Sequence, residues 1–251
     1  MVFFVGAGSG DPGLITVRGA ALLQEADCVI YAGSLVNPAL LAYCSDDCRI
    51  LNSAEMTLEE VIKAVKETEK EGGMTVRLHT GDPCLYGAIK EQMDELDALG
   101  IEYGYVPGVS SFCGAASALK CEYTLPSVSQ TVIITRMEGR TPVPEGEKIE
   151  SLARHGCTMV IFLSSGMLGK LAEELTKGAY TYESKAALVY KATWPEEKVI
   201  HTDLGHLAED AEKNGISRTA LVIVGDILNG IYERSRLYDP SFTTGYREAT
   251  E

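Results

Sequence analysis

Three glycine-containing loops carry the residues best suited to chemistry in this chain. In chain order they are Gly6–Asp11, Gly81–Pro83 and Pro107–Ser111, and each follows a short apolar run typical of a β-strand. Glycine lets main-chain N–H and C=O groups come close to a ligand, because it has no Cβ atom. In an open parallel sheet, ligands bind outside the carboxyl ends of the strands. The three loops therefore predict one small-molecule site.

The same loops exclude several common chemistries. A dinucleotide fingerprint starting at Gly6 would need glycine where Asp11 stands, and an acidic residue where Ala32–Ser34 follows the second strand-like run. No Gly-Lys-Ser/Thr phosphate loop and no G-x-S-x-G nucleophile turn occurs. His79 adjoins the second loop and is predicted to be a surface or supporting residue. The loops offer main-chain amides and small side chains, which predict a neutral ligand held by hydrogen bonds rather than by charge.

The composition and the net charge argue against several classes of partner. The 251 residues include 22 basic and 36 acidic side chains, a net charge of −14, which argues against nucleic acid or an anionic membrane as partner. No apolar run approaches the ~18 to 20 residues of a membrane span, and no signal-type segment opens the chain. Of seven cysteines only Cys44 and Cys48 are close, without further ligands for a metal. We expect a cytoplasmic protein with reduced thiols and no metal site.

The elements that position these loops alternate between strand and helix up to about residue 119. This alternation predicts a parallel sheet with helices on both faces, and Thr57 with Glu60 predicts a capping box at one helix start. The pattern lapses before Pro126, and two adjacent strands flanking Ala192–Glu197 predict a hairpin in a second, mixed sheet. We therefore expect an α/β protein with domains at 1–125 and 126–230 and a polar tail at 231–251.

Five segments together resemble the tetrapyrrole methylase family, whose members use S-adenosylmethionine to methylate corrin and sirohaem precursors. The segments are Val5–Thr16, Arg77–Gly87, Val106–Ser111, Ala186–Val189 and Thr219–Gly225. They lie in family order, and the resemblance covers residues 1 to about 230. It implies two α/β domains with the methyl donor in a cleft between them, and a homodimer.

Two more segments, Tyr31–Val36 and Asn52–Leu58, resemble the branch that methylates C11 of precorrin-4, either metal-free or as cobalt-precorrin-4. Uroporphyrinogen methylases carry an Asp-Arg pair where Ala32-Gly33 stands here, which counts against the sirohaem reaction. Another precorrin or uroporphyrinogen methylase, or diphthine synthase, stays open as an alternative. A non-catalytic binder of a nucleotide or tetrapyrrole is a more remote one.

The resemblance also implies residue roles. Contacts to S-adenosylmethionine are expected from Thr80, Gly81, Asp82, Leu85, Ser110, Ser111, Leu163, Ala192 and Ala220. The first loop, with Gly8, Ser9 and Gly10, moves to the tetrapyrrole side. Asp11 is a candidate for orienting or deprotonating a pyrrole group, and a loop or helix-cap carboxylate is the equal alternative.

The acceptor's own carboxylates call for basic side chains, because a guanidinium pairs with a carboxylate through two parallel hydrogen bonds. The arginines nearest to the expected loops are Arg18, Arg77, Arg136 and Arg140. We expect Arg18 and Arg136 in particular to bind the tetrapyrrole.

Overall fold

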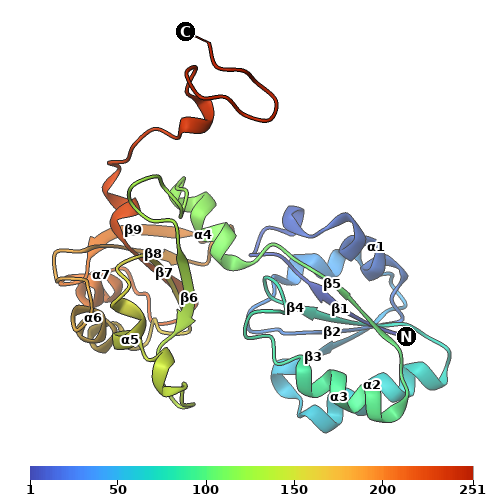
Figure 1. Ribbon diagram of the computed structural model, residues 1–251. Helices are drawn as coiled ribbons and strands as arrows, with labels where there is room; N and C mark the ends of the chain where they lie inside the picture. Colours follow the sequence, from blue (N-terminus) through green and yellow to red (C-terminus); the bar gives the residue numbers. More distant parts are fainter. Residues whose placement is uncertain (251) are drawn as a thin grey trace. The chain divides into compact units, whose positions relative to one another are not determined.

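The computed structural model describes residues 1–250 and divides the chain into two compact units (Figure 1). The first contains Met1–Ala115 together with Lys191–Glu197, and the second contains the rest, beginning at Ala116. The division lies ten residues before the boundary expected after residue 125, and the helix Ser111–Leu119 runs across it. The segment Lys191–Glu197 joins the first unit although it follows residues of the second along the chain.

The first unit is built on a five-stranded sheet in the order β3-β2-β4-β1-β5. Its strands are β1 (Val2–Gly6), β2 (Cys28–Tyr31), β3 (Arg49–Asn52), β4 (Thr75–His79) and β5 (Tyr103–Val106), and all four pairings are parallel. This confirms the parallel sheet. Gly6 pairs with His79 and Val5 with Val106, so the loops that follow β4, β1 and β5 leave the sheet side by side.

Helices cover both faces of this sheet, as the alternation predicted. Helix α1 (Val17–Glu25) and the 3₁₀ helix η2 (Pro38–Tyr43) pack with Val5, Val29 and Val76 on one face. Helices α2 (Leu58–Lys70) and α3 (Lys90–Leu99) pack with Phe4 and Ile30 on the other. Figure 1 shows the sheet between these two helical layers. The predicted capping box is present at the start of α2, where Thr57 and Glu60 bond each other's main-chain N–H groups.

The strand order creates a switch point between β1 and β4. The chain leaves β1 toward β2 and β3 at one edge of the sheet, and it leaves β4 toward β5 at the other edge. Neighbouring strands whose connections run in opposite directions leave a crevice at their carboxyl ends, which is where open α/β sheets bind ligands. The first two glycine loops follow these two strands, so they lie at the end of the sheet where a ligand is expected.

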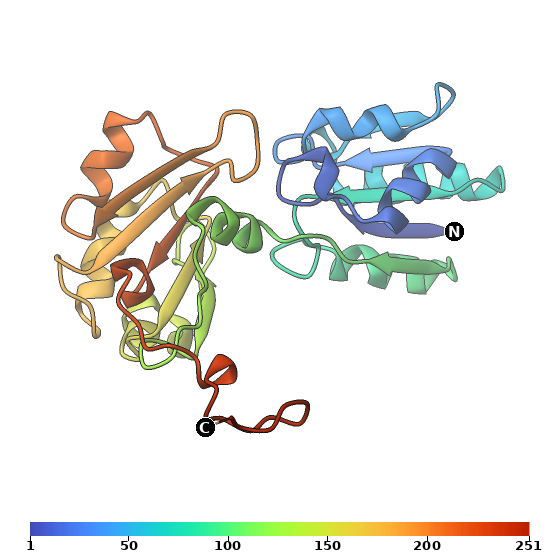
Figure 2. The same cartoon turned by 90° about the horizontal axis from the view of Figure 1, so that it is seen from above.

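The second unit has a mixed five-stranded sheet in the order β6-β7-β10-β8-β9. Strands β6 (Val132–Arg136) and β7 (Thr158–Phe162) are parallel, and β10 (Ala220–Val224) runs antiparallel to both β7 and β8 (Lys185–Tyr190). The mixed sheet is confirmed. So is the predicted hairpin, because β9 (Lys198–Asp203) pairs antiparallel with β8, and Figure 2 shows the two strands adjacent in orange.

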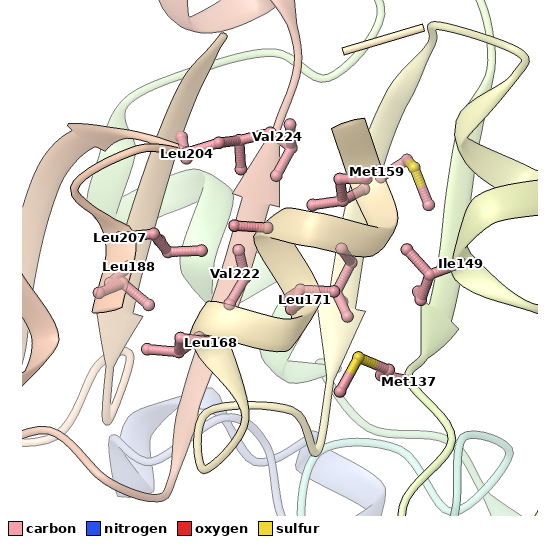
Figure 3. Close-up of a cluster of buried hydrophobic side chains, with 14 of the residues drawn as sticks. Met137, Ile149, Met159, Leu168, Leu171, Leu188, Leu204, Leu207, Val222 and Val224 are labelled. Atoms are coloured by element: carbon pink, nitrogen blue, oxygen red, sulfur yellow. The ribbon is translucent and has the colours of Figure 1, made fainter. Parts of the chain in front are cut away.

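Leu171, Leu188 and Val222 lie in the core between this second sheet and its helices (Figure 3). The helices of the unit are α5 (Ile149–Ala153), α6 (Leu168–Thr176) and α7 (Leu207–Lys213), and α4 (Ser111–Leu119) precedes them. Single 3₁₀ turns occur at Pro12–Leu14, Ser53–Glu55, Glu145–Glu147, Asp226–Asn229 and Arg236–Tyr238.

The C-terminal residues are less polar on their surface than the sequence suggested. Ile231, Tyr232, Tyr238 and Tyr246 are all more than half exposed. Arg247 holds part of this segment by donating hydrogen bonds to main-chain carbonyls around the Arg236–Tyr238 turn. The last residue of the predicted tail, Glu251, lies outside the described residues. Within residues 1–250, no helix has both the length and the apolar character needed to cross a membrane.

Candidate functional site

Three glycines at the strand ends bring the three loops into direct contact. A Cβ atom placed on Gly6 would lie 2.5 Å from the Cα of Gly108, and one placed on Gly108 would lie 2.2 Å from the carbonyl oxygen of Gly81. These positions belong to the ends of β1, β5 and β4 respectively. Because a side chain on Gly6 or Gly108 would force the backbones apart, the close approach of the loops requires glycine at these two positions, and Gly81 has a left-handed backbone (φ 60°) that favours glycine. We call this contact the glycine cluster.

Main-chain hydrogen bonds fasten the first loop to the second. The Gly8 N–H donates to the Gly81 carbonyl at 3.2 Å, and the Gly81 N–H donates back to the Gly8 carbonyl at 2.8 Å. The Ala7 N–H also donates to the His79 carbonyl at 2.7 Å. The two loops on either side of the switch point therefore behave as one connected piece of backbone.

The carboxylate of Asp82 fastens the second loop to the third. Its Oδ1 accepts from the Cys84 N–H at 2.8 Å and from the Tyr105 hydroxyl, and its Oδ2 accepts from the Gly108 N–H at 2.9 Å. Partial burial opposes ionisation of Asp82, but these hydrogen bonds outweigh it and lower the pKa of the carboxyl. Both carboxylate oxygens are thus engaged within the protein, and the side chain holds the loops together.

The structure places five of the residues expected at the donor side by side in the first unit. Thr80, Gly81 and Leu85 lie on the second loop, and Ser110 and Ser111 lie on the third. A Cβ atom on Gly81 would be 3.3 Å from the Ser111 nitrogen, so the two loops touch at these residues. Ser110 is buried, and Thr80, Leu85 and Ser111 are half-buried. This surface offers main-chain groups and hydroxyls but no charged side chain of its own apart from the engaged Asp82.

The remaining expected donor residues come from later in the chain. Leu163 follows β7 in a left-handed conformation (φ 52°) and is 62% exposed. Ala220 opens β10, and the antiparallel register of β10 with β7 places it at the same end of the second sheet as Leu163. Ala220 also pairs with Tyr190, two residues before the buried Ala192. Ala192 belongs to the segment Lys191–Glu197 that groups with the first unit.

Asp11 has a capping role in the structure. It is the N-cap of the turn Pro12–Leu14, and its Oδ1 accepts from the Gly13 N–H at 2.8 Å. The Asp11 N–H donates to the hydroxyl of Thr193 at 3.0 Å, and the Ser9 hydroxyl lies 3.0 Å from the same oxygen. Thr193 was missed from the sequence. It is a β-branched residue at φ 67°, and a strained conformation of this kind has no signature in the residue type.

Arg77 is not available to a ligand, so the expectation that it faces the acceptor is wrong. It lies in the middle of β4, is 5% exposed, and donates to the Ile30 carbonyl at 2.6 Å and to Gln92 at 2.7 Å. Side chains alternate between the faces of a strand, and this position faces the layer of α2 and α3. The sequence spacing to the second loop could not reveal that direction.

His79 shares this face of β4 and is buried as well, so of the two expected roles, surface or supporting, the surface role is wrong. It is 5% exposed, and its Nε2 has no hydrogen-bond partner among residues 1–250. Burial, with a smaller contribution from the charge of Arg77, lowers the pKa of the imidazole to about 3. The ring is therefore neutral near pH 7 and is unsuited to acid–base catalysis there.

The other three candidate arginines differ in the contacts that they make within the protein. Arg18 is exposed, and its guanidinium carbon lies 5.8 Å from the centroid of the Phe3 ring. Arg136, in the second unit, donates to three carbonyls of the following turn, at 2.8 to 3.4 Å. Arg140 is exposed in that turn. Of the two arginines expected at the tetrapyrrole, Arg18 has the fewer protein contacts.

Comparison with known proteins gives consistent results. The sequence profile for Tetrapyrrole (Corrin/Porphyrin) Methylases matches residues 1–208. A cobalt-precorrin-4 C(11)-methyltransferase of Methanocaldococcus jannaschii is 52% identical over 99% of this chain and 96% of its own length. The X-ray structure of a cobalt precorrin-4 methyltransferase, described as a cobalamin biosynthetic enzyme, superposes with a TM-score of 0.88 at 46% identity, covering 90% of this chain and 95% of that one. The uroporphyrin-III C-methyl transferase of Thermus thermophilus, complexed with S-adenosyl homocysteine, has a TM-score of 0.76 at 26% identity, with coverages of 93% and 95%.

Proposed function

Because this chain belongs to the tetrapyrrole (corrin/porphyrin) methylase family, we propose that it transfers a methyl group from S-adenosylmethionine to C11 of cobalt-precorrin-4. The product would be cobalt-precorrin-5, an intermediate of cobalamin biosynthesis. The observation that carries this proposal is the 52% identity with the Methanocaldococcus jannaschii methyltransferase over 99% of the chain.

The loops of the first unit suit the adenosyl donor. When bound, S-adenosylmethionine supplies a methyl group that is already activated by its sulfonium sulfur. The ligand needs hydrogen bonds and close contact, and the glycine cluster lets the backbones of the three loops approach closely enough to present their main-chain groups together. We propose that Thr80, Gly81 and Leu85 contact the donor from one loop, and Ser110 and Ser111 from the next. Asp82 contributes by holding these loops in register.

Leu163, Ala192 and Ala220 stay proposed donor contacts on the ground of the family resemblance. Support for a donor of this kind comes from the Thermus thermophilus relative, which was crystallised with S-adenosyl homocysteine.

Methyl transfer by in-line displacement depends mainly on alignment and on the exclusion of water. The paired hydrogen bonds between Gly8 and Gly81 link the proposed acceptor loop to the proposed donor loop. Gly8 therefore holds a fixed position relative to Gly81, which is what an alignment mechanism needs. Asp11 uses Oδ1 for its cap, so contact with a pyrrole group of the acceptor would use Oδ2.

Basic side chains are needed for the acceptor carboxylates. We propose Arg18 for this role, because it is exposed and lies one turn beyond the first loop. Arg136 stays a second candidate, because its three hydrogen bonds to carbonyls use only three of the five N–H donors of the guanidinium.

The decisive experiment is turnover with S-adenosylmethionine carrying a ¹³C-labelled methyl group. Cobalt-precorrin-4 is the test substrate, and metal-free precorrin-4 and uroporphyrinogen III are compared in parallel. We expect one new methyl signal at C11 of the cobalt substrate. A methyl group at another ring position, or turnover of uroporphyrinogen III alone, would replace this proposal with one of the other family reactions.

We further propose a cytoplasmic homodimer. Support for a reducing compartment comes from the cysteines, which are all free in the structure of residues 1–250. The dimer follows from the family resemblance. Light scattering coupled to size exclusion should give twice the 27.1 kDa mass of the chain.

A further inference from the structure

A buried polar network lies beneath the second loop. It begins at Arg77 in the centre of the first sheet, where Nη1 donates to the Ile30 carbonyl at 2.6 Å. The Arg77 Nε donates to Oε1 of Gln92 in α3 at 2.7 Å. The Gln92 Nε2 then donates to the main-chain carbonyl of Ala88 at 2.8 Å. Three hydrogen bonds thus connect the middle of the sheet to the far end of the loop that begins at Thr80.

The charge of Arg77 dictates how the Gln92 amide is oriented. Arg77 is 5% exposed, and no carboxylate within the described part of the chain forms an ion pair with it. Burial lowers the pKa of its guanidinium to about 10, so it is charged at neutral pH. A guanidinium only donates hydrogen bonds, so the amide oxygen of Gln92 must face it. The amide NH₂ group must then point the other way, toward Ala88.

The loop end that receives this hydrogen bond is under backbone strain. Tyr86 (φ 57°) and Ala88 (φ 48°) are both left-handed without being glycine. A Cβ atom on the intervening Gly87 would lie 2.2 Å from the Pro83 carbonyl oxygen, so the turn is tightly closed. Such conformations persist only where surrounding contacts impose them. Ile89, the N-cap of α3, makes no side-chain hydrogen bond, and the Gln92 side chain donates to the carbonyl of Ala88 just before it.

We propose that Arg77 and Gln92 are positioning residues for methyl transfer. They hold Ala88 in its left-handed conformation and thereby set the Thr80–Leu85 stretch for contact with the donor. The second anchor of the same loop is Asp82, which binds the third loop. The loop is therefore held at Asp82 and at Ala88, on either side of Leu85. This inference rests on the proposed function, because that function makes the loop a donor site.

The variant Gln92→Glu separates positioning from general stability. It keeps an oxygen for the Arg77 Nε and adds a carboxylate beside the buried guanidinium, so the melting temperature should be maintained or raised. It also removes the donor to Ala88 and turns an acceptor toward that carbonyl. We expect faster amide hydrogen exchange in residues 80–89. We also expect a Kd for S-adenosylhomocysteine about threefold to tenfold higher, as the loss of one hydrogen bond predicts. Gln92→Met, which cannot make either contact, should show the same two changes.

The matched control is Glu91→Gln, an exposed neighbour in α3 that should leave both readouts unchanged. The inference would be overturned if a folded Gln92 variant showed wild-type amide hydrogen exchange in residues 80–89 and wild-type affinity for S-adenosylhomocysteine. If the wild-type protein itself fails to bind S-adenosylhomocysteine in calorimetry, the proposed function falls. The exchange measurement still decides whether Gln92 holds the loop.

Discussion

The stability of this protein should depend on pH through His79, and the size of the effect can be worked out from its burial. The imidazole is 5% exposed, and its folded-state pKa is about 3, against 6.5 in an exposed site. Above pH 6.5 the ring is neutral in both the folded and the unfolded chain. Between pH 6.5 and 3 the unfolded chain binds a proton that the folded chain refuses. Acidification therefore favours the unfolded state in this window.

The expected magnitude follows from the linkage relation. Each pH unit inside the window lowers the free energy of unfolding by about 1.4 kcal/mol. On acidification from pH 7.5 to pH 5.0, about 1.5 pH units lie below the unfolded-state pKa of 6.5. This corresponds to roughly 2 kcal/mol of unfolding free energy lost through His79. The variant His79→Leu carries no titrating group at this position and should not show this loss.

Urea denaturation at pH 7.5 and pH 5.0 measures the effect in both proteins. The difference in unfolding free energy between wild type and His79→Leu should shift by about 2 kcal/mol in favour of the variant at the lower pH. Exposed groups such as His206 are common to both proteins and cancel in the comparison. Parallel pH profiles for the two proteins would refute the argument, because they would mean that the imidazole titrates alike in the folded and unfolded chains.

Three further perturbations test the loops. Gly108→Ala places a Cβ atom 2.2 Å from the Gly81 carbonyl oxygen and should lower the free energy of unfolding by about 1 to 3 kcal/mol in thermal or urea unfolding. The control Gly146→Ala lies in open space and should lower it little. Equal effects of the two variants would contradict the glycine cluster. Asp82→Asn turns an NH₂ group toward one of the N–H groups that donate to the carboxylate, so S-adenosylhomocysteine binding should weaken by tenfold or more in calorimetry. Unchanged affinity would mean that the loops stay joined without the carboxylate. Asp11→Asn keeps an oxygen for the cap, so folding should be unaffected. A drop in turnover would assign the carboxylate to the chemistry, and wild-type turnover would leave Asp11 as a cap alone.

Local sequence signals were reliable where the structure depends on near neighbours. The strand–helix alternation gives the predicted parallel sheet, and Thr57 with Glu60 forms the predicted capping box. Helix α3 begins only at Lys90, a boundary that local periodicity does not set. The reason is the left-handed backbone of Tyr86 and Ala88, which tertiary contacts impose against the preference of those residues.

What the sequence by itself determined is the class of elements, the three loops, and the family to which their motifs belong. These depend on residue type and short-range periodicity. Only the tertiary structure decided the roles of the polar side chains. Arg77 faces the helices, Asp82 is consumed in joining two loops, and Thr193 contacts the first loop from more than 180 residues away in the chain. The strand order β3-β2-β4-β1-β5 creates the contacts of Arg77 and Asp82, because it places side by side segments that no local pattern relates.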